Sequence, residues 1–236
     1  MARLLKEDRY NTKRNEILDM ARRLIYTKGY EQLTIQDLLD GLHISRGALY
    51  HYFASKETLL AALVGRMGQE AVQYLEPIAQ DARLTAIQKF NRYFEVSAQW
   101  KSTQKDLIID LMRVWFADEN AFIRQKMGEE SRKYMTTFFE TAIRQGNAEE
   151  TFTVRHPGQA AAIIAGASLS LTDHIISLLL SGQLDRSVIQ ELEDTLDAYG
   201  DAVERILGAP TGTLHVFEPG GFDDWLTEIR PVPAGE

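Results

Sequence analysis

The spacing of apolar residues along the chain predicts helices over most of its length. In residues 11–28 apolar side chains recur at intervals of three and four, and Gly29 follows as a helix C-cap. A second apolar stripe occupies residues 34–42, and a third short helix carries Leu49 and Phe53 on its inner face. No stretch of useful length alternates apolar and polar residues, so the pattern predicts an all-α protein.

Longer helical segments follow. One begins near Ser55 and keeps helical spacing as far as Pro77, which is expected to end it. The remaining segments are separated by short runs of Ser, Thr, Asp, Asn, Gly and Pro, and they cover residues 81–101, 105–117, 120–146, 157–182 and 187–207. Residues 1–10 contain little that could pack, and we weigh a basic arm that touches DNA against a solvated, disordered tail.

Residues 160–180 are apolar nearly all round. A bilayer span needs about 20 such residues, but Asp173 and His174 interrupt this one, so we expect no membrane segment. A helix that is apolar on every side is expected to be buried on every side. Because the next helix also carries an apolar stripe, and one chain offers few neighbours for both, we expect a homodimer through residues 160–207.

Residues 34–56 predict two short helices joined by a tight turn. Thr34 can cap the first, with Asp37 three residues on, and Ser45 can cap the second. Small residues near the start of the second helix allow close backbone approach, and its other outward side chains can donate to phosphates and base edges. This outward set is Arg46, Gly47, Ala48, Tyr50, His51 and Tyr52. The arrangement is typical of a helix-turn-helix.

The string SRGALYHYFASKETLL resembles the recognition-helix signature of TetR-family transcriptional repressors, S-[KR]-G-x-L-Y-x-[HY]-F-x-x-K-E-x-L. The resemblance spans about residues 11–64. It implies a three-helix DNA-binding domain followed by a larger helical domain for ligand binding and dimerisation, and a repressor that a small-molecule effector releases from a near-palindromic operator. The DNA-binding residues that it implies are Thr34, Gln36, Arg46, Gly47, Ala48, Tyr50, His51, Tyr52 and Lys56.

Several local alternatives stay open at this point. The family usually has Gly where this chain has His43, and Ala where it has Leu39. The left-handed residue of the turn is therefore either His43, which adopts that conformation at a cost, or Gly41. Tyr52 can belong to the core or contact DNA. Lys56 lies in the first turn of a helix, where it can meet a phosphate or be an ordinary surface lysine.

Charge is distributed unevenly over a chain whose net charge is −8. Residues 1–56 contain 10 Lys and Arg against 7 Asp and Glu, whereas the remainder contains 16 against 27. A basic N-terminal segment followed by an acidic remainder is expected to orient the molecule so that residues 1–56 face a polyanion such as double-stranded DNA. The chain has no cysteine, which excludes disulfides and thiolate metal sites and is compatible with the cytoplasm.

Enzyme chemistry finds little support. The five histidines include no pair three or four residues apart, and no nucleophile elbow, phosphate-binding loop or dinucleotide fingerprint occurs. We expect no catalysis, metal or cofactor. Aromatic, polar and charged residues within the apolar helices are the candidates for binding a largely apolar effector: Tyr93, Phe94, Trp100, Met112, Arg113, Trp115, Phe138, Asp173 and His174.

The sequence thus suggests a helix-turn-helix domain over residues 1–56, a helical effector-binding and dimerisation domain over 57–208, and a partly ordered extension over 209–236. The extension is expected to dock through a short amphipathic helix formed by Phe222, Trp225, Leu226 and Ile229. The alternative function is a DNA-binding regulator that responds to a protein partner instead of a small molecule. The choice between repressor and activator is open from the residues alone.

Overall fold

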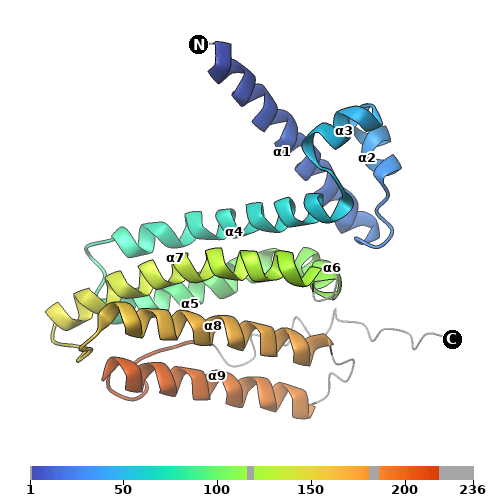
Figure 1. The fold of residues 1–236 in the computed structure, drawn as a ribbon. Helices are drawn as coiled ribbons and strands as arrows, with labels where there is room; N and C mark the ends of the chain where they lie inside the picture. The colour runs from blue at the N-terminus through green and yellow to red at the C-terminus, as the bar shows by residue number, and fades with distance from the viewer. Residues whose placement is uncertain (1, 116–119, 181–185, 218–236) are drawn as a thin grey trace. The chain divides into compact units, whose positions relative to one another are not determined.

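The computed structural model describes residues 2–115, 120–180 and 186–217, and within these ranges it consists of helices and contains no strand. The all-α prediction is therefore confirmed. The helices are α1 (Ala2–Lys28), α2 (Ile35–Leu42), α3 (Arg46–Tyr52), α4 (Lys56–Gln80), α5 (Ala86–Thr103), α6 (Lys105–Trp115), α7 (Ala121–Ala148), α8 (Pro157–Leu180) and α9 (Arg186–Leu207) (Figure 1). The expected helix of the extension, with Phe222, Trp225, Leu226 and Ile229, lies outside the described residues.

Three helix boundaries differ from the prediction by three residues or more. Helix α1 begins at Ala2, so residues 2–10 are neither a flexible arm nor a disordered tail; most of them are good helix formers, and no Gly or Pro separates them from the rest of α1. Helix α4 continues past Pro77 to Gln80, three residues beyond the predicted end. Helix α5 begins at Ala86, after the Thr85 cap.

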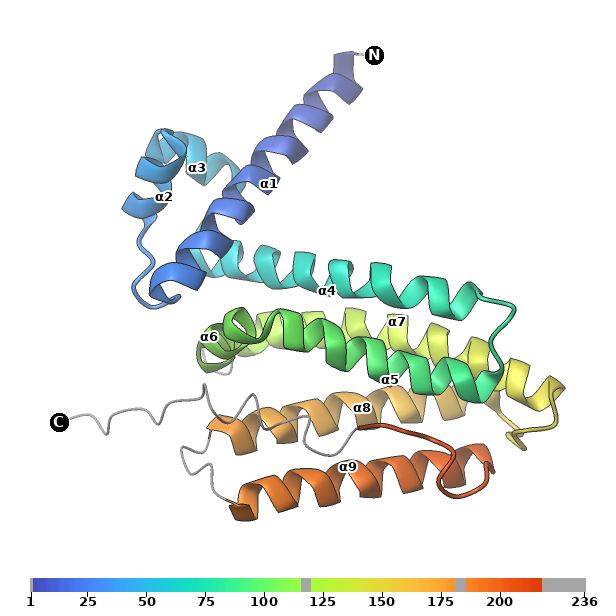
Figure 2. The same ribbon diagram turned by 180° about the vertical axis from the view of Figure 1, so that it is seen from behind.

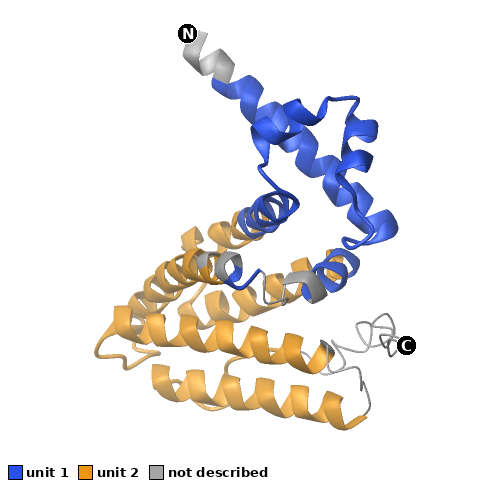
Figure 3. Ribbon diagram, turned by 45° about the vertical axis from the view of Figure 1, so that its right-hand side comes forward, with its two compact units in different colours: residues 1–69, 106–124 blue, residues 70–105, 125–236 orange. Residues whose placement is uncertain are grey.

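The chain divides into two compact units (Figure 3). Unit 1 comprises Met1–Gln69 and Asp106–Arg124, and unit 2 comprises Glu70–Lys105 and Gln125–Glu236. This division by contacts separates α4 at Gln69, and the functional boundaries proposed at residues 56 and 208 stay predictions.

The core of unit 1 forms where the first three helices meet. The side chains of Leu38 and Leu49 are almost completely buried, as are those of α1 that recur at helical spacing: Ile17, Leu18, Ala21 and Ile25. Leu49 and Phe53 are buried as their four-residue spacing predicts. Helix α3 therefore turns one face inward and leaves its other face to solvent.

Unit 2 is a bundle in which α5, α7, α8 and α9 lie side by side (Figures 1 and 2). Aromatic rings fill its centre: Phe90 stacks on Phe139 with ring centroids 5.2 Å apart. A buried hydroxyl pair joins α8 to α9. Ser168 donates to the carbonyl of Ile164 at 2.9 Å, so in its 2.5 Å contact with Tyr199 the tyrosine is the donor. Burial raises the pKa of Tyr199 to about 12, which keeps this donor protonated.

Residues 209–217, here called the C-terminal strap, pack against unit 2. The buried carboxylate of Glu204 accepts hydrogen bonds from the backbone N–H groups of Gly212, Thr213 and Leu214 at 2.7–3.0 Å. Asn91 donates to the carbonyl of Thr213 and accepts from the N–H of His215, each at 2.9 Å. These contacts place Leu214 in the core of unit 2.

Within the single chain, helix α8 is not buried on every side, and the expectation that a second chain covers its outer face stays a prediction. Its inner face, including Ala161 and Ile164, is completely buried, whereas the Ile163 side chain is 60% exposed. The bundle of a single chain covers only one face of α8, and the outer face is left to solvent. By length and composition alone α8 could cross a bilayer, but its inner face packs within a helical bundle.

Candidate nucleic-acid interface

Helix α2 begins at the predicted capping box. The Thr34 hydroxyl accepts from the N–H of Asp37 at 3.2 Å, and the Asp37 carboxylate accepts from the N–H of Thr34 at 2.7 Å. Lys28 forms an ion pair with the same carboxylate. Hydrogen bonds from Lys28 and Thr34 hold the pKa of Asp37 well below its usual range. The negative charge of Asp37 in the first turn of α2 stabilises the helix, because it interacts favourably with the positive end of the helix dipole.

His43 is the left-handed residue of the turn, with φ 52° and ψ 45°. Its N–H and that of Ile44 both reach the carbonyl of Leu39, the latter at 3.1 Å. Gly41 lies inside α2 and has a different function. A Cβ at this position would stand 2.9 Å from Sδ of Met20, so the glycine allows α1 and α2 to approach closely. The structure thus decides between the two candidates for the left-handed position.

Helix α3 presents the predicted outward residues. Ser45 caps it by accepting from the N–H of Ala48 at 3.2 Å. The exposed residues of the helix itself are Arg46, Gly47, Ala48, Tyr50 and His51, whereas Tyr52 is half-buried. Among the described residues, a Cβ placed on Gly47 would meet nothing within 4 Å, so no contact with them requires a glycine there. The small residue instead leaves the N-terminal end of α3 open to an external surface.

An aromatic cluster that the sequence reasoning missed lies at the C-terminal end of α3. The ring of Tyr10 on α1 is 4.8 Å from that of Tyr52 and 5.8 Å from that of His51, centroid to centroid. The His51 and Tyr52 rings are 5.2 Å apart. The available signal was the helical spacing of Tyr10, Arg14 and Ile17, which puts Tyr10 on the inner side of α1 once the helix is extended.

Two other predicted contact residues have partners within the chain. The Lys56 ammonium donates to the carbonyl of Tyr30 at 2.8 Å and lies 4.2 Å from the centroid of the Tyr30 ring. Burial lowers the pKa of Lys56. Gln36 is exposed and donates to the carboxylate of Asp40 at 2.7 Å. Lys56 thereby ties the start of α4 to the loop after α1, and the phosphate contacts of both residues stay predictions.

Among the effector candidates, the structure brings Tyr93, Phe94 and Phe138 together within unit 2. Tyr93 and Phe138 are buried in the aromatic core of unit 2 and Phe94 packs against it, while Met112 is buried and Trp100 is half-buried. Asp173 and His174 are exposed on α8 of the single chain, and their contribution to effector binding stays a prediction. Water solvates them because α8 covers the core with its other face. The side chains of Arg113 and Trp115 lie outside the described part of the chain.

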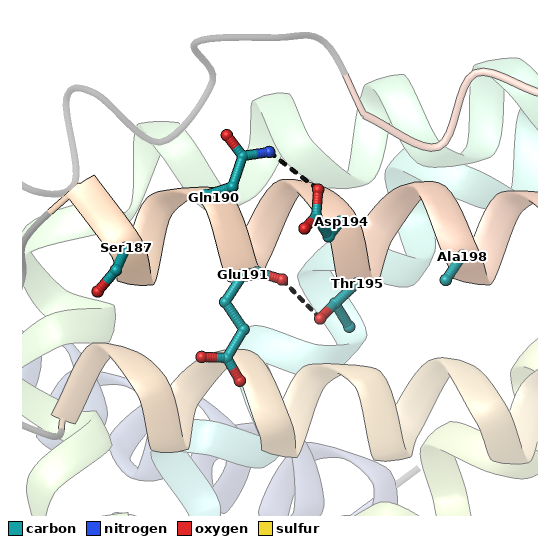
Figure 4. A pocket seen from close by; sticks show the side chains of 6 residues that line it. All are labelled: Ser187, Gln190, Glu191, Asp194, Thr195 and Ala198. Carbon is teal, nitrogen blue, oxygen red and sulfur yellow. Dashed lines mark hydrogen bonds between the residues drawn. The ribbon is translucent and has the colours of Figure 1, made fainter.

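A hollow on unit 2 offers no alternative site. It is lined by Ser187, Gln190, Glu191, Asp194, Thr195 and Ala198, all from α9 (Figure 4). Gln190 donates to Asp194 at 2.9 Å and Thr195 to the carbonyl of Glu191 at 2.6 Å, so these side chains are already bonded along the helix. Among the described residues, no three His, Asp or Glu side chains gather as metal ligands would.

The geometry of α1–α3 defines a helix-turn-helix protein. Residues 17–63 match the family "Bacterial regulatory proteins, tetR family". Over 54 residues the chain is 39% identical to the HTH-type transcriptional repressor KstR2 of Mycobacterium tuberculosis, covering 23% of this chain and 27% of that protein. Over 69 residues it is 38% identical to the repressor AcnR of Corynebacterium diphtheriae, covering 29% and 35%.

The larger part of the chain is similar to known structures in fold alone. A TetR-family transcriptional regulator from Pectobacterium atrosepticum superposes with a TM-score of 0.59 at 21% identity, over 86% of this chain and 98% of that one. The chain spans only about a quarter to a third of the length of the curated repressors named above. The match over residues 17–63 shows that the chain carries a TetR-family helix-turn-helix domain, and the remaining helices share only their fold with that structure.

Proposed function

We propose that this protein is a cytoplasmic transcriptional repressor that binds double-stranded DNA through α3. The observation that carries the proposal is the outer face of α3, where Arg46 is exposed beside Gly47, a glycine that no contact with the described residues requires. Relatives that match this region are named repressors, which favours repression over activation. Arginine is the commonest reader of guanine in the major groove, and Gly47 and Ala48 permit close approach.

The neighbouring residues are assigned by their position. Tyr50 and His51 are exposed and can donate to phosphate or sugar oxygens. Thr34 and Gln36 lie at the start of α2, where helix N-termini favour phosphate. Tyr52 is half-buried against Tyr10 and offers only part of its ring to DNA.

Arg46→Ala tests the assignment in a binding-site selection from random duplex DNA. We expect Arg46→Ala to discriminate less between bases at one position of the site, with a loss of about 1–3 kcal/mol in the free energy of discrimination. Arg155→Ala, which removes the same charge from an exposed position of unit 2, is expected to leave the preference unchanged. An Arg46→Ala variant that keeps the full wild-type preference would remove Arg46 from base readout.

We further propose that the protein acts as a homodimer through residues 160–207 on a near-palindromic operator. A two-fold dimer places two recognition helices one turn of DNA apart, about 34–36 Å, or slightly more. The outer face of α8 supports this interface, because it combines small residues with the exposed Ile163.

Sedimentation tests this interface with Ile163→Lys. The control is Tyr74→Lys, since Tyr74 is also 60% exposed and belongs to the same unit. We expect Ile163→Lys to shift the protein towards monomer at micromolar concentration and the control to remain dimeric. A dimeric Ile163→Lys variant would place the interface elsewhere.

The release mechanism completes the proposal: a largely apolar small molecule would bind within the helical body and favour a dimer whose recognition helices no longer match the operator. Only a difference in effector affinity between the two states can shift the equilibrium. Thermal-shift measurements against metabolite panels test it, because an effector stabilises by mass action. The alternative, control by a protein partner, predicts no stabilising metabolite and co-purification of a protein that weakens DNA binding.

A further inference from the structure

Tyr10 occupies an unusual place beside the recognition helix. It lies on the N-terminal part of α1, and its ring is 37% exposed. The ring meets Tyr52 at an interplanar angle of 31° and meets His51 nearly edge-on at 86°. One turn farther along α1, the guanidinium carbon of Arg14 lies 5.3 Å from the centroid of the Phe53 ring. The same face of α1 therefore contacts three consecutive residues, 51–53, at the C-terminal end of α3.

A helix as short as α3 depends on such contacts. It has seven residues, too few to be stable by itself in water. Leu49 and Phe53 hold its inner face against the core, but neither contacts the outer rings of His51 and Tyr52 in the way that Tyr10 does. Without Tyr10 these two side chains would be able to rotate, because solvent would replace the ring that packs against both.

We propose that Tyr10 is a positioning residue for DNA binding: its ring holds His51 and Tyr52 in the orientation in which they meet the sugar–phosphate backbone. The inference rests on the proposed function of α3. A side chain that is already ordered loses less entropy when DNA arrives, so the aromatic cluster raises affinity without adding a contact. Because the contact is made by the ring, the phenolic hydroxyl of Tyr10 is dispensable.

The experiment measures binding to a duplex that the wild-type protein selects from a random pool. We expect Tyr10→Ala to weaken binding by about three- to tenfold, the effect of freeing one or two side chains. Tyr10→Phe keeps the ring and is expected to restore wild-type affinity. Tyr26→Ala is the matched control, since Tyr26 lies on the same helix and is 64% exposed. None of these substitutions removes a charge, so we expect every variant to show the wild-type slope when the logarithm of the binding constant is plotted against the logarithm of the salt concentration.

A spectroscopic measurement separates positioning from a general loss of stability. Nuclear magnetic resonance of the His51 ring protons, assigned with His51→Gln, should show a shift caused by the Tyr10 ring current that disappears in Tyr10→Ala and persists in Tyr10→Phe. If Tyr10→Ala does not fold, Tyr10→Leu takes its place because it keeps apolar bulk without a ring.

Three results would overturn the proposal. The first is a variant without the ring that binds DNA with wild-type affinity. The second is a His51 signal that does not change in that variant. The third is a Tyr10→Phe variant that binds as weakly as Tyr10→Ala, which would mean that the hydroxyl itself contacts DNA. A wild-type protein that selects no duplex would refute the proposed function and this inference with it, whereas the three results above would refute the inference alone.

Discussion

Replacing His43 by glycine is expected to stabilise the turn between α2 and α3. His43 has φ 52° and ψ 45°, close to the centre of the left-handed region, and its side chain is exposed. The Cβ of an L-residue costs about 1–2 kcal/mol in this conformation. Glycine removes that cost in the folded state but gives the unfolded chain more freedom, which costs about 0.4–1 kcal/mol. The difference favours His43→Gly by about 0.5–1 kcal/mol.

Native-state hydrogen exchange is the suitable assay, because it reports the opening of this turn apart from unfolding of the whole chain. The N–H of Ile44, bonded to the carbonyl of Leu39 at 3.1 Å, is the reporter. We expect about two- to fivefold slower exchange in His43→Gly, the factor that corresponds to the free-energy gain. His43→Ala is the control: it keeps a Cβ and should exchange as the wild type does.

Two results would refute this reasoning. Equal exchange in the glycine and alanine variants would show that the Cβ causes no strain at this position. Faster exchange in the glycine variant would show that the imidazole makes a stabilising contact that outweighs the backbone cost.

Three further predictions concern contacts between distant residues. Lys56→Ala should lower the urea midpoint of unfolding, because the Tyr30 carbonyl loses a charged hydrogen-bond donor worth about 1.5–3 kcal/mol. An unchanged midpoint would show that this hydrogen bond does not stabilise the fold, and contact with a phosphate would then be the only role proposed for Lys56. Gly146→Ala should destabilise the folded protein by about 1–3 kcal/mol, since the new Cβ would stand 2.0 Å from Cδ2 of the buried Phe152 ring. Gly128→Ala on the same helix is the control: its Cβ would meet none of the described residues within 4 Å, so the substitution should be neutral or stabilising. Glu204→Gln should speed hydrogen exchange of the Gly212 amide, because the glutamine oxygen can replace Oε1, which accepts from Thr213 and Leu214, and its NH₂ group then faces the N–H of Gly212 and accepts no hydrogen bond from it; unchanged protection of Gly212 would show that other contacts hold the strap.

Features that depend on neighbours three or four residues away could be predicted from the sequence. The Thr34–Asp37 capping box, the Ser45 cap, the Gly29 helix end and the inward direction of Leu49 and Phe53 are all observed. Each follows from the hydrogen-bonding and side-chain geometry of one or two helical turns. The all-α class follows from the same periodicity.

The sequence by itself therefore determined the helices, their caps and the outward face of α3, because these properties are local. Helical periodicity shows which face is apolar but does not show what covers it. Only the tertiary structure decided that Tyr10 packs against residues about forty positions later, that Lys56 bonds to the Tyr30 carbonyl, and that α8 exposes Asp173 and His174. Only the tertiary structure also showed that His43, and not Gly41, is the left-handed residue of the turn. The glycine at position 41 is explained by the close approach of Met20, which lies on another helix.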